Sequence, residues 1–160
     1  EATRVAYLGP AGTFSQQVRI VGATEKPASI PYRANMTLLD AMIAVGGLSP
    51  RPDRPSHEVA AYLQRAGYRI IPVNPACEEV LGEKCYPSLR EIPVPIDLVD
   101  VFRRPEDVMA VAEDAIAVGA RALWLQLGVI APQAAARAEQ AGLKVVMDRC
   151  TKIDHRALLR

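Results

Sequence analysis

Several features that would assign a small protein to a special class are missing from this sequence. Its three cysteines, Cys77, Cys85 and Cys150, are an odd number, and no Cys-x-x-Cys pair occurs. The histidines are only His57 and His155, so a structural zinc site is not expected. A chain of 160 residues can also build a core without disulfides. Reduced thiols and a cytoplasmic setting are therefore the expectation.

Excess charge and long apolar runs are also absent. The net charge is +1, so no strong field favours nucleic acid or an anionic membrane as a partner. No apolar run approaches the roughly 18 residues of a membrane span. The opening EATRVAYLG lacks the basic and then apolar build of a signal peptide. These absences leave a globular protein with a small-molecule ligand, and a homodimer is compatible with them.

From residue 43 onward, short apolar segments alternate with helical patterns. The expected strands are 43–45, 69–73, 96–102, 122–127 and 144–148, and the expected helices are 55–66, 105–118, 132–141 and a short one from 154. Gly67, Gly119 and Gly142 each follow a helix, as glycine commonly does. This alternation predicts an α/β fold. It consists of a Rossmann-like, parallel five-stranded sheet with helices on both faces.

Residues 1–42 follow a different pattern. Short strands are expected at 4–8, 18–21 and 30–32, the last as an edge strand that tolerates proline. Thr37 is a plausible N-cap for a short helix, with Asp40 as the acid of a capping box. We therefore expect a small N-terminal α+β extension over 1–42 and a separate domain over 43–160.

The stretch IAVGGLSPRPDRPSHEVA, residues 43–60, carries the strongest functional signal. It reads as a buried strand, a loop with two arginines and the start of a helix. Free N–H groups and the helix dipole make such a junction a phosphate site, and Arg51 and Arg54 could clamp phosphate oxygens. The glycine spacing is not G-x-G-x-x-G, and Asn74 stands where an acid would hold a ribose, so NAD is less favoured. A solvated turn with two surface arginines is the alternative.

Two further groups of residues follow strands. Arg103 and Arg104 end the third strand, so that at least one of them could reach the crevice where parallel sheets bind ligands. Near the fifth strand, Arg149 or Lys152 could lower the pKa of Cys150, and a Cys150–His155 pairing is conceivable. A small buried cysteine after a strand is the commoner situation.

The segment from residue 43 to 159 resembles the small stand-alone CoA-binding proteins, which are related to the CoA-binding domain of the succinyl-CoA synthetase α subunit. The similar text is IAVGGLSPRPDRPSHEVAAYLQRAGYRIIPVNP, EVLGEKCYPSL, VDVFRRPEDV, LWLQLGV and VVMDRCTKIDH. One departure is Gly46, where that family usually has a strand valine. The family's phosphorylated histidine and grasp domain lie outside this module, so the resemblance does not imply ligase activity.

The resemblance implies a CoA site in the loops that follow the first four strands. The implied residues are Gly47, Leu48, Ser49, Arg51, Arg54, Pro55, Ser56, Asn74, Pro75, Phe102, Arg103, Arg104, Pro105, Gln126 and Gly128. The leading hypothesis is non-catalytic binding of coenzyme A or a related adenine nucleotide, with no metal. The alternatives are a CoA-dependent enzyme that uses Cys150 and His155, and an engineered scaffold without a ligand.

Two short N-terminal stretches resemble other families. VAYLGPAGTFSQ, within 4–16, is similar to the opening of prephenate dehydratases, but their Thr-Arg-Phe motif does not occur downstream. Residues 18–47 resemble a soluble-ligand-binding β-grasp repeat of polysaccharide export proteins, with Pro27-Ala28 in place of the usual Pro-Gly. Two partial resemblances to unrelated families suggest a composite or engineered chain.

Overall fold

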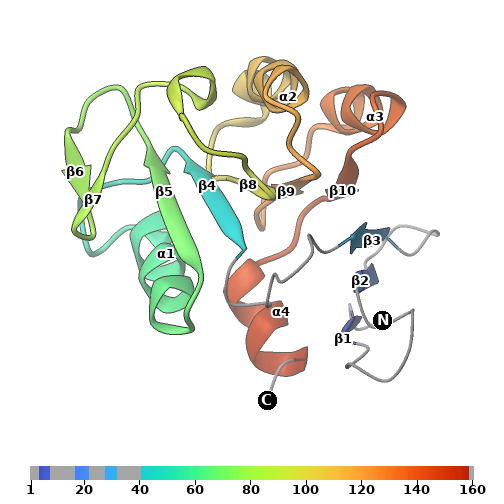
Figure 1. The fold of residues 1–160 in the computed structure, drawn as a ribbon, viewed down its shortest axis with the longest axis horizontal. Helices are drawn as coiled ribbons and strands as arrows, with labels where there is room; N and C mark the ends of the chain where they lie inside the picture. Colours follow the sequence, from blue (N-terminus) through green and yellow to red (C-terminus); the bar gives the residue numbers. More distant parts are fainter. Residues whose placement is uncertain (1–3, 8–16, 22–27, 32–40, 159–160) are drawn as a thin grey trace.

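A parallel five-stranded sheet with helices on both faces forms the main body of the protein (Figure 1). The computed structural model describes residues 4–7, 17–21, 28–31 and 41–158. The strands run in the order β10-β9-β8-β4-β5. Their bounds are β4 (Met42–Gly46), β5 (Arg69–Val73), β8 (Leu98–Val101), β9 (Ala122–Leu125) and β10 (Lys144–Val146). The predicted α/β Rossmann-like fold is confirmed.

The helices form two layers, with α2 and α3 on one face of the sheet and α1 and α4 on the other (Figure 1). Their bounds are α1 (Pro55–Arg65), α2 (Val108–Ala117), α3 (Pro132–Gln140) and α4 (Thr151–Leu158). Alternate residues of β4 serve the two layers: Ala44 packs with α2 and α3, whereas Ile43 and Val45 pack on the α1 side. This double burial is why the strand reads as a continuous apolar run.

The ends of several elements differ from the sequence-based expectation. Helix α1 begins at Pro55, where the fixed φ of proline suits the first turn, and Gly67 follows it at φ +102°. The expected helix at 105–118 is a 3₁₀ turn, Pro105–Asp107, followed by α2. Helix α4 begins at Thr151 instead of 154, because the Asp154 N–H already bonds to the Cys150 carbonyl.

The long connection after β5 contains its own structure. A two-stranded hairpin, β6 (Glu79–Val80) and β7 (Glu83–Lys84), projects beside β5. A 3₁₀ turn, Leu89–Glu91, then leads toward β8. The sequence predicted only a loop here, since two-residue strands carry no period that a pattern could reveal.

A separate antiparallel sheet precedes the main one. Its strands are β1 (Arg4–Tyr7), β2 (Gln17–Val21) and β3 (Ala28–Pro31), in the order β1-β2-β3. Strand β1 lies against α4, and β3 lies against β10. The predicted short helix that begins near Thr37 lies outside the described residues. Among the helices that the structure describes, none is long and apolar enough to cross a membrane.

The strand order has one topological switch point. Strand β4 lies inside the sheet, between the edge strand β5 and the middle strand β8, and the chain passes first to β5 and then to β8. The loop after β4 leads to α1 on one face of the sheet, and the loop after β8 leads to α2 on the other face, so the two loops separate at the carboxyl ends of these neighbouring strands. Ligands of open α/β sheets bind in the crevice at such a point.

Candidate functional site

Gly47 forms the floor of the crevice immediately after β4. Its φ is +81°, and a Cβ there would lie 2.6 Å from the Phe102 carbonyl oxygen. The Gly47 N–H donates to the Val73 carbonyl at 3.0 Å, and the Phe102 N–H donates to the Gly46 carbonyl at 2.9 Å. The ends of three neighbouring strands therefore meet at one glycine that no larger residue can replace without strain.

The loop from Ser49 to Arg54 is held by its own serines. The Ser49 N–H donates to Ser56 Oγ at 3.0 Å, and the Arg51 N–H donates to Ser49 Oγ at 3.2 Å. The exposed Arg51 guanidinium pairs with Asp53 at 2.9 Å. In the described part of the chain, the exposed Arg54 side chain has no ion pair or hydrogen bond to another residue. Arg54 is thus the cation of this loop that can meet an anion without giving up a partner.

Asn74 joins the loops that follow β4 and β5. Its Nδ2 donates to the Leu48 carbonyl at 3.0 Å, and its Oδ1 accepts from the Ala76 N–H at 2.9 Å. Its own N–H donates to the Tyr86 carbonyl at 2.9 Å. The Asn74 side chain, which stands where a ribose-binding acid would be, therefore holds the loop after β4 against the loop after β5.

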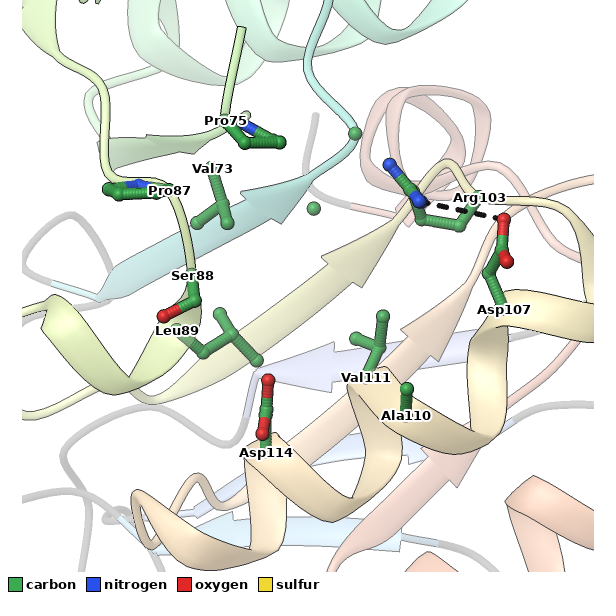
Figure 2. Close-up of a pocket in the computed structure, with 12 residues that line it drawn as sticks. Val73, Pro75, Pro87, Ser88, Leu89, Arg103, Asp107, Ala110, Val111 and Asp114 are labelled. Atoms are coloured by element: carbon green, nitrogen blue, oxygen red, sulfur yellow. Dashed lines mark ion pairs between the residues drawn. The ribbon is translucent and has the colours of Figure 1, made fainter.

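A cavity of about 230 Å³ lies between these strand ends and α2 (Figure 2). It includes three residues of the predicted site, Gly47, Pro75 and Arg103. The other lining residues are Gly46, Val73, Pro87, Ser88, Leu89, Asp107, Ala110, Val111 and Asp114. The sequence-based prediction did not include these residues, although Asp107, Ala110, Val111 and Asp114 have the spacing of one helix face. That spacing could have indicated a lining surface; the segment 87–89 carried no such signal.

Two ion pairs control the charge in and around this cavity. Arg103 Nη2 lies 3.5 Å from Asp107 Oδ2 at one end, on the side of the picture opposite Pro75 (Figure 2). Asp114 is paired with Arg90 at 2.6 Å between Nε and Oδ1. Arg103 is 43% exposed, so its ion pair with Asp107 is weak and can be exchanged for a ligand anion. The cavity can accept a polar ligand that carries negative charge near Arg103.

The carboxyl ends of β8 and β9 are closed by a buried polar cluster. Gln126 Nε2 donates to Asp100 Oδ1 at 2.6 Å and to Thr151 Oγ1 at 2.7 Å, while Thr151 Oγ1 donates to Asp100 Oδ2 at 3.0 Å. Asp100 is fully buried. Burial raises the pKa of Asp100 to about 7, although the bonds from Gln126 and Thr151 act in the opposite direction.

Neighbouring contacts extend this closed region. The Gly128 N–H donates to Asp148 Oδ1 at 2.7 Å, and Trp124 Nε1 donates to the Arg149 carbonyl at 2.7 Å. Arg149 pairs with Asp154 at 2.9 Å. Gln126 was predicted to line the crevice, yet its side chain is 3% exposed and bonded within the fold. Ligand contact by Gln126 and Gly128 stays a prediction.

Cys150 and His155, the weak catalytic candidates, have other contacts. His155 Nδ1 is hydrogen-bonded to Tyr62 Oη at 2.8 Å, and its ring meets those of Tyr62 and Tyr68 edge-on. Burial lowers the pKa of His155. Cys150 packs against the apolar cluster on the α1 side.

The two cations that the sequence associated with Cys150 are both paired with carboxylates. Arg149 is held by Asp154 and Lys152 by Glu58. Neither ion pair involves the Cys150 thiol, so the charges that were expected to activate it are already compensated.

The remaining predicted residues have mixed positions. The Leu48 side chain is fully buried, and Phe102 packs against the same apolar cluster. Pro55, Arg104 and Pro105 are exposed at the starts of their helical turns. The structure thus brings the loops after β4, β5 and β8 together around the cavity, while the loop after β9 belongs to the closed part of the edge.

Comparisons with known proteins agree with this fold. A family model described as a CoA binding domain matches residues 41–156. The uncharacterized protein YneT of Bacillus subtilis is 49% identical over 113 residues, which are 71% of this chain and 84% of that protein. A solved structure of a hypothetical protein from Pyrococcus horikoshii has 44% identity and a TM-score of 0.72, and the match covers 74% of this chain and 83% of that one.

A more distant similarity concerns an enzyme. The ADP-forming acetate–CoA ligase II of Archaeoglobus fulgidus is 36% identical over 58 residues, which are 35% of this chain and 9% of the ligase. None of these matches supports the N-terminal resemblances or a composite origin, which stay predictions.

Proposed function

This chain belongs to the CoA binding domain family, and we propose that it binds coenzyme A, or a related adenine nucleotide, without catalysing a reaction itself. The observation that carries the proposal is the cavity at the switch point between β4 and β8. Gly47, which lacks a side chain and so lets the chain after β8 pass close by, lines this cavity, and Arg103 supplies positive charge there.

The phosphate groups of such a ligand would meet the arginines of the open edge. Arg54 is unpaired within the described residues, while Arg51 and Arg103 would exchange exposed acidic partners for phosphate oxygens. A volume of about 230 Å³ is below the range of roughly 300–1,000 Å³ typical of ligand pockets. We therefore infer that the cavity holds one part of the coenzyme and that the rest lies across the exposed loop.

The same proposal covers the organisation of the chain. Residues 43–160 form the binding unit, and residues 1–42 are an extension of composite origin. This division is supported by the separate three-stranded sheet of β1, β2 and β3. Three cysteines without a disulfide suit a cytoplasmic setting.

The test is a calorimetric titration of the whole chain with coenzyme A, with NAD and ATP as controls. We expect a dissociation constant in the micromolar range or below for coenzyme A and much weaker binding of NAD. Tight NAD binding with no preference for coenzyme A would contradict the proposed ligand, and a chain that binds none of the three would fit a scaffold without a ligand.

A further inference from the structure

Two cysteines flank the neck of the β6–β7 hairpin, next to the cavity. Pro75 and Pro87, on either side of the hairpin, both line the cavity. Cys77 lies two residues after Pro75, and Cys85 lies two residues before Pro87. A disulfide between the two cysteines would therefore join the segment that enters the hairpin after Pro75 to the segment that leaves it before Pro87.

The backbone brings these cysteines together. The Cys85 N–H donates to the Glu78 carbonyl at 2.8 Å, so Cys85 faces the residue next to Cys77 across the neck. The Asn74 carbonyl oxygen accepts from the Cys77 N–H and from Cys85 Sγ, each at 3.4 Å. The sulfur of one cysteine and the backbone of the other thus reach the same atom. Disulfides join residues whose Cα atoms are about 4.4–6.8 Å apart. Cys77 is one residue before the partner of Cys85 in the hairpin register, so the two cysteines lie diagonally across the neck.

The two thiols differ in their access to solvent. Cys85 is 5% exposed, whereas Cys77 is partly exposed, and both pack with the apolar cluster on the α1 side. Burial raises the pKa of the Cys85 thiol, and the nearby Cys77 raises it further when it is a thiolate. Of these two thiols, Cys77 is consequently the one that an external reagent reaches first.

We propose that Cys77 and Cys85 are a redox-active pair that forms a reversible disulfide by exchange with low-molecular-weight disulfides. In the first step the Cys77 thiolate attacks one sulfur of the small disulfide, a mixed disulfide forms, and one small thiolate leaves and takes up a proton. In the second step Cys85 loses its proton and attacks the Cys77 sulfur, which releases the second small thiol. One small disulfide is reduced to two thiols while two protein thiols are oxidised to one disulfide.

The disulfide would change the wall of the cavity through Asn74. The Cys85 sulfur would no longer donate to the Asn74 carbonyl, and the neck between Pro75 and Pro87 would be covalently fixed. Asn74 also holds the Leu48 carbonyl of the first loop. A change in the redox state of the two cysteines would in this way alter the contacts of the loops after both β4 and β5.

The experiment treats the reduced protein with glutathione disulfide, blocks the remaining thiols by alkylation and maps the peptides by mass spectrometry. We expect two of the three thiols to be lost, a peptide that links Cys77 to Cys85, and full reversal by dithiothreitol. No ligand is added, so the result can be read whether or not the chain binds coenzyme A.

Three variants identify the partners. Cys150→Ser should still form the disulfide, and Cys85→Ser should stop at a glutathione adduct on Cys77. Cys77→Ser should leave Cys85 unmodified while the protein is folded; circular dichroism checks that each variant folds. A disulfide that involves Cys150, an adduct that forms first on Cys85, or three free thiols after full treatment would each overturn the proposal.

Discussion

The carboxyl edge of the five-stranded sheet is open over β4, β5 and the α2 side of β8, and it is closed over β9, β10 and the α4 side of β8. On the open half, Gly47 and Arg103 line a cavity, and Arg54 is exposed in the loop after β4. On the closed half, Gln126 and Asp148 occupy equivalent places after their strands, but both bond within the fold. Residues that follow a strand are therefore exposed at a cavity in one place and bonded within the fold in another.

The difference lies in which partner reaches the strand end. Helix α4 brings Thr151 over the end of β8, where it completes the hydrogen bonds of Asp100. Within the described residues, the only side-chain partner of Arg103 is Asp107, an exposed acid at the end of the 3₁₀ turn that follows. A polar residue at a sheet edge is thus available to a ligand when no later element of the chain covers it. The four predictions that follow test this contrast.

The largest effect is expected from Asp100→Asn on the closed half. The pKa of Asp100 is raised from 3.8 to about 7 by burial, so the folded state holds its proton more tightly than the unfolded state. Stability from this group is therefore present at low pH and lost as the pH rises to about 7, by about 4 kcal/mol. The asparagine, which imitates the neutral acid, removes this pH dependence.

Urea denaturation of both proteins from about pH 4 to pH 8 checks this prediction. The wild-type free energy of unfolding should fall relative to that of the variant across the range. Two curves that remain parallel would mean that Asp100 titrates as an ordinary exposed acid, and the contrast between the two halves would be lost.

Gly47→Ala should have the next largest effect, on the open half. The new methyl group would meet the Phe102 carbonyl at 2.6 Å with the backbone at φ +81°. The strain and the displaced backbone should cost about 2–4 kcal/mol of stability and close the floor of the cavity. Thermal unfolding and coenzyme titration measure the two consequences; an unchanged melting temperature would contradict the proposed close approach.

Arg54→Ala should weaken coenzyme binding and leave the fold unchanged. The loss of a charge-assisted phosphate contact should cost about 1.5–3 kcal/mol, roughly a tenfold to hundredfold change in the dissociation constant. Arg51→Ala should act in the same direction by less, because Arg51 already pairs with Asp53. Arg65→Ala, an equal charge change at the far end of α1, is the control, and an equal loss in that variant would remove the phosphates from this loop.

Gly46→Ala should produce the smallest effect and sharpen the contrast with its neighbour. A Cβ at this position meets the Asp100 carbonyl oxygen at 3.8 Å, which is ordinary contact. Replacing a strand glycine should stabilise the protein by about 0.5–1 kcal/mol. Destabilisation as large as that of Gly47→Ala, measured by the same thermal unfolding, would show that the fold requires glycine at both positions.

Local signals allowed the main elements to be predicted. Strand β5 has the expected bounds, 69–73, because a buried apolar segment ends there at Asn74 and Pro75. Long-range contacts could not be predicted in this way. Thr151 begins α4 and bonds to Asp100, which is 51 residues earlier. No property of the sequence near Gln126 indicates that Asp100 and Thr151 will both bond to the Gln126 side-chain amide.

The site was predicted in part for the same reason. Gly47 and Pro75 follow strands directly, so the topology of the sheet was enough to assign them to the crevice. Leu89 lines the same cavity because of the path that the connection takes after the hairpin. That path depends on tertiary packing, which no turn signal in the segment specified.

The position of β4 between two later strands also has a consequence for synthesis on the ribosome. Strand β4 is made before both of its neighbours, and the second of them, β8, ends at Val101. Until that residue has emerged, one hydrogen-bonding edge of an apolar strand lacks its native partner. The nascent chain therefore carries an aggregation-prone strand from the synthesis of β4 until β8 has emerged. Chaperone binding during this interval would protect it.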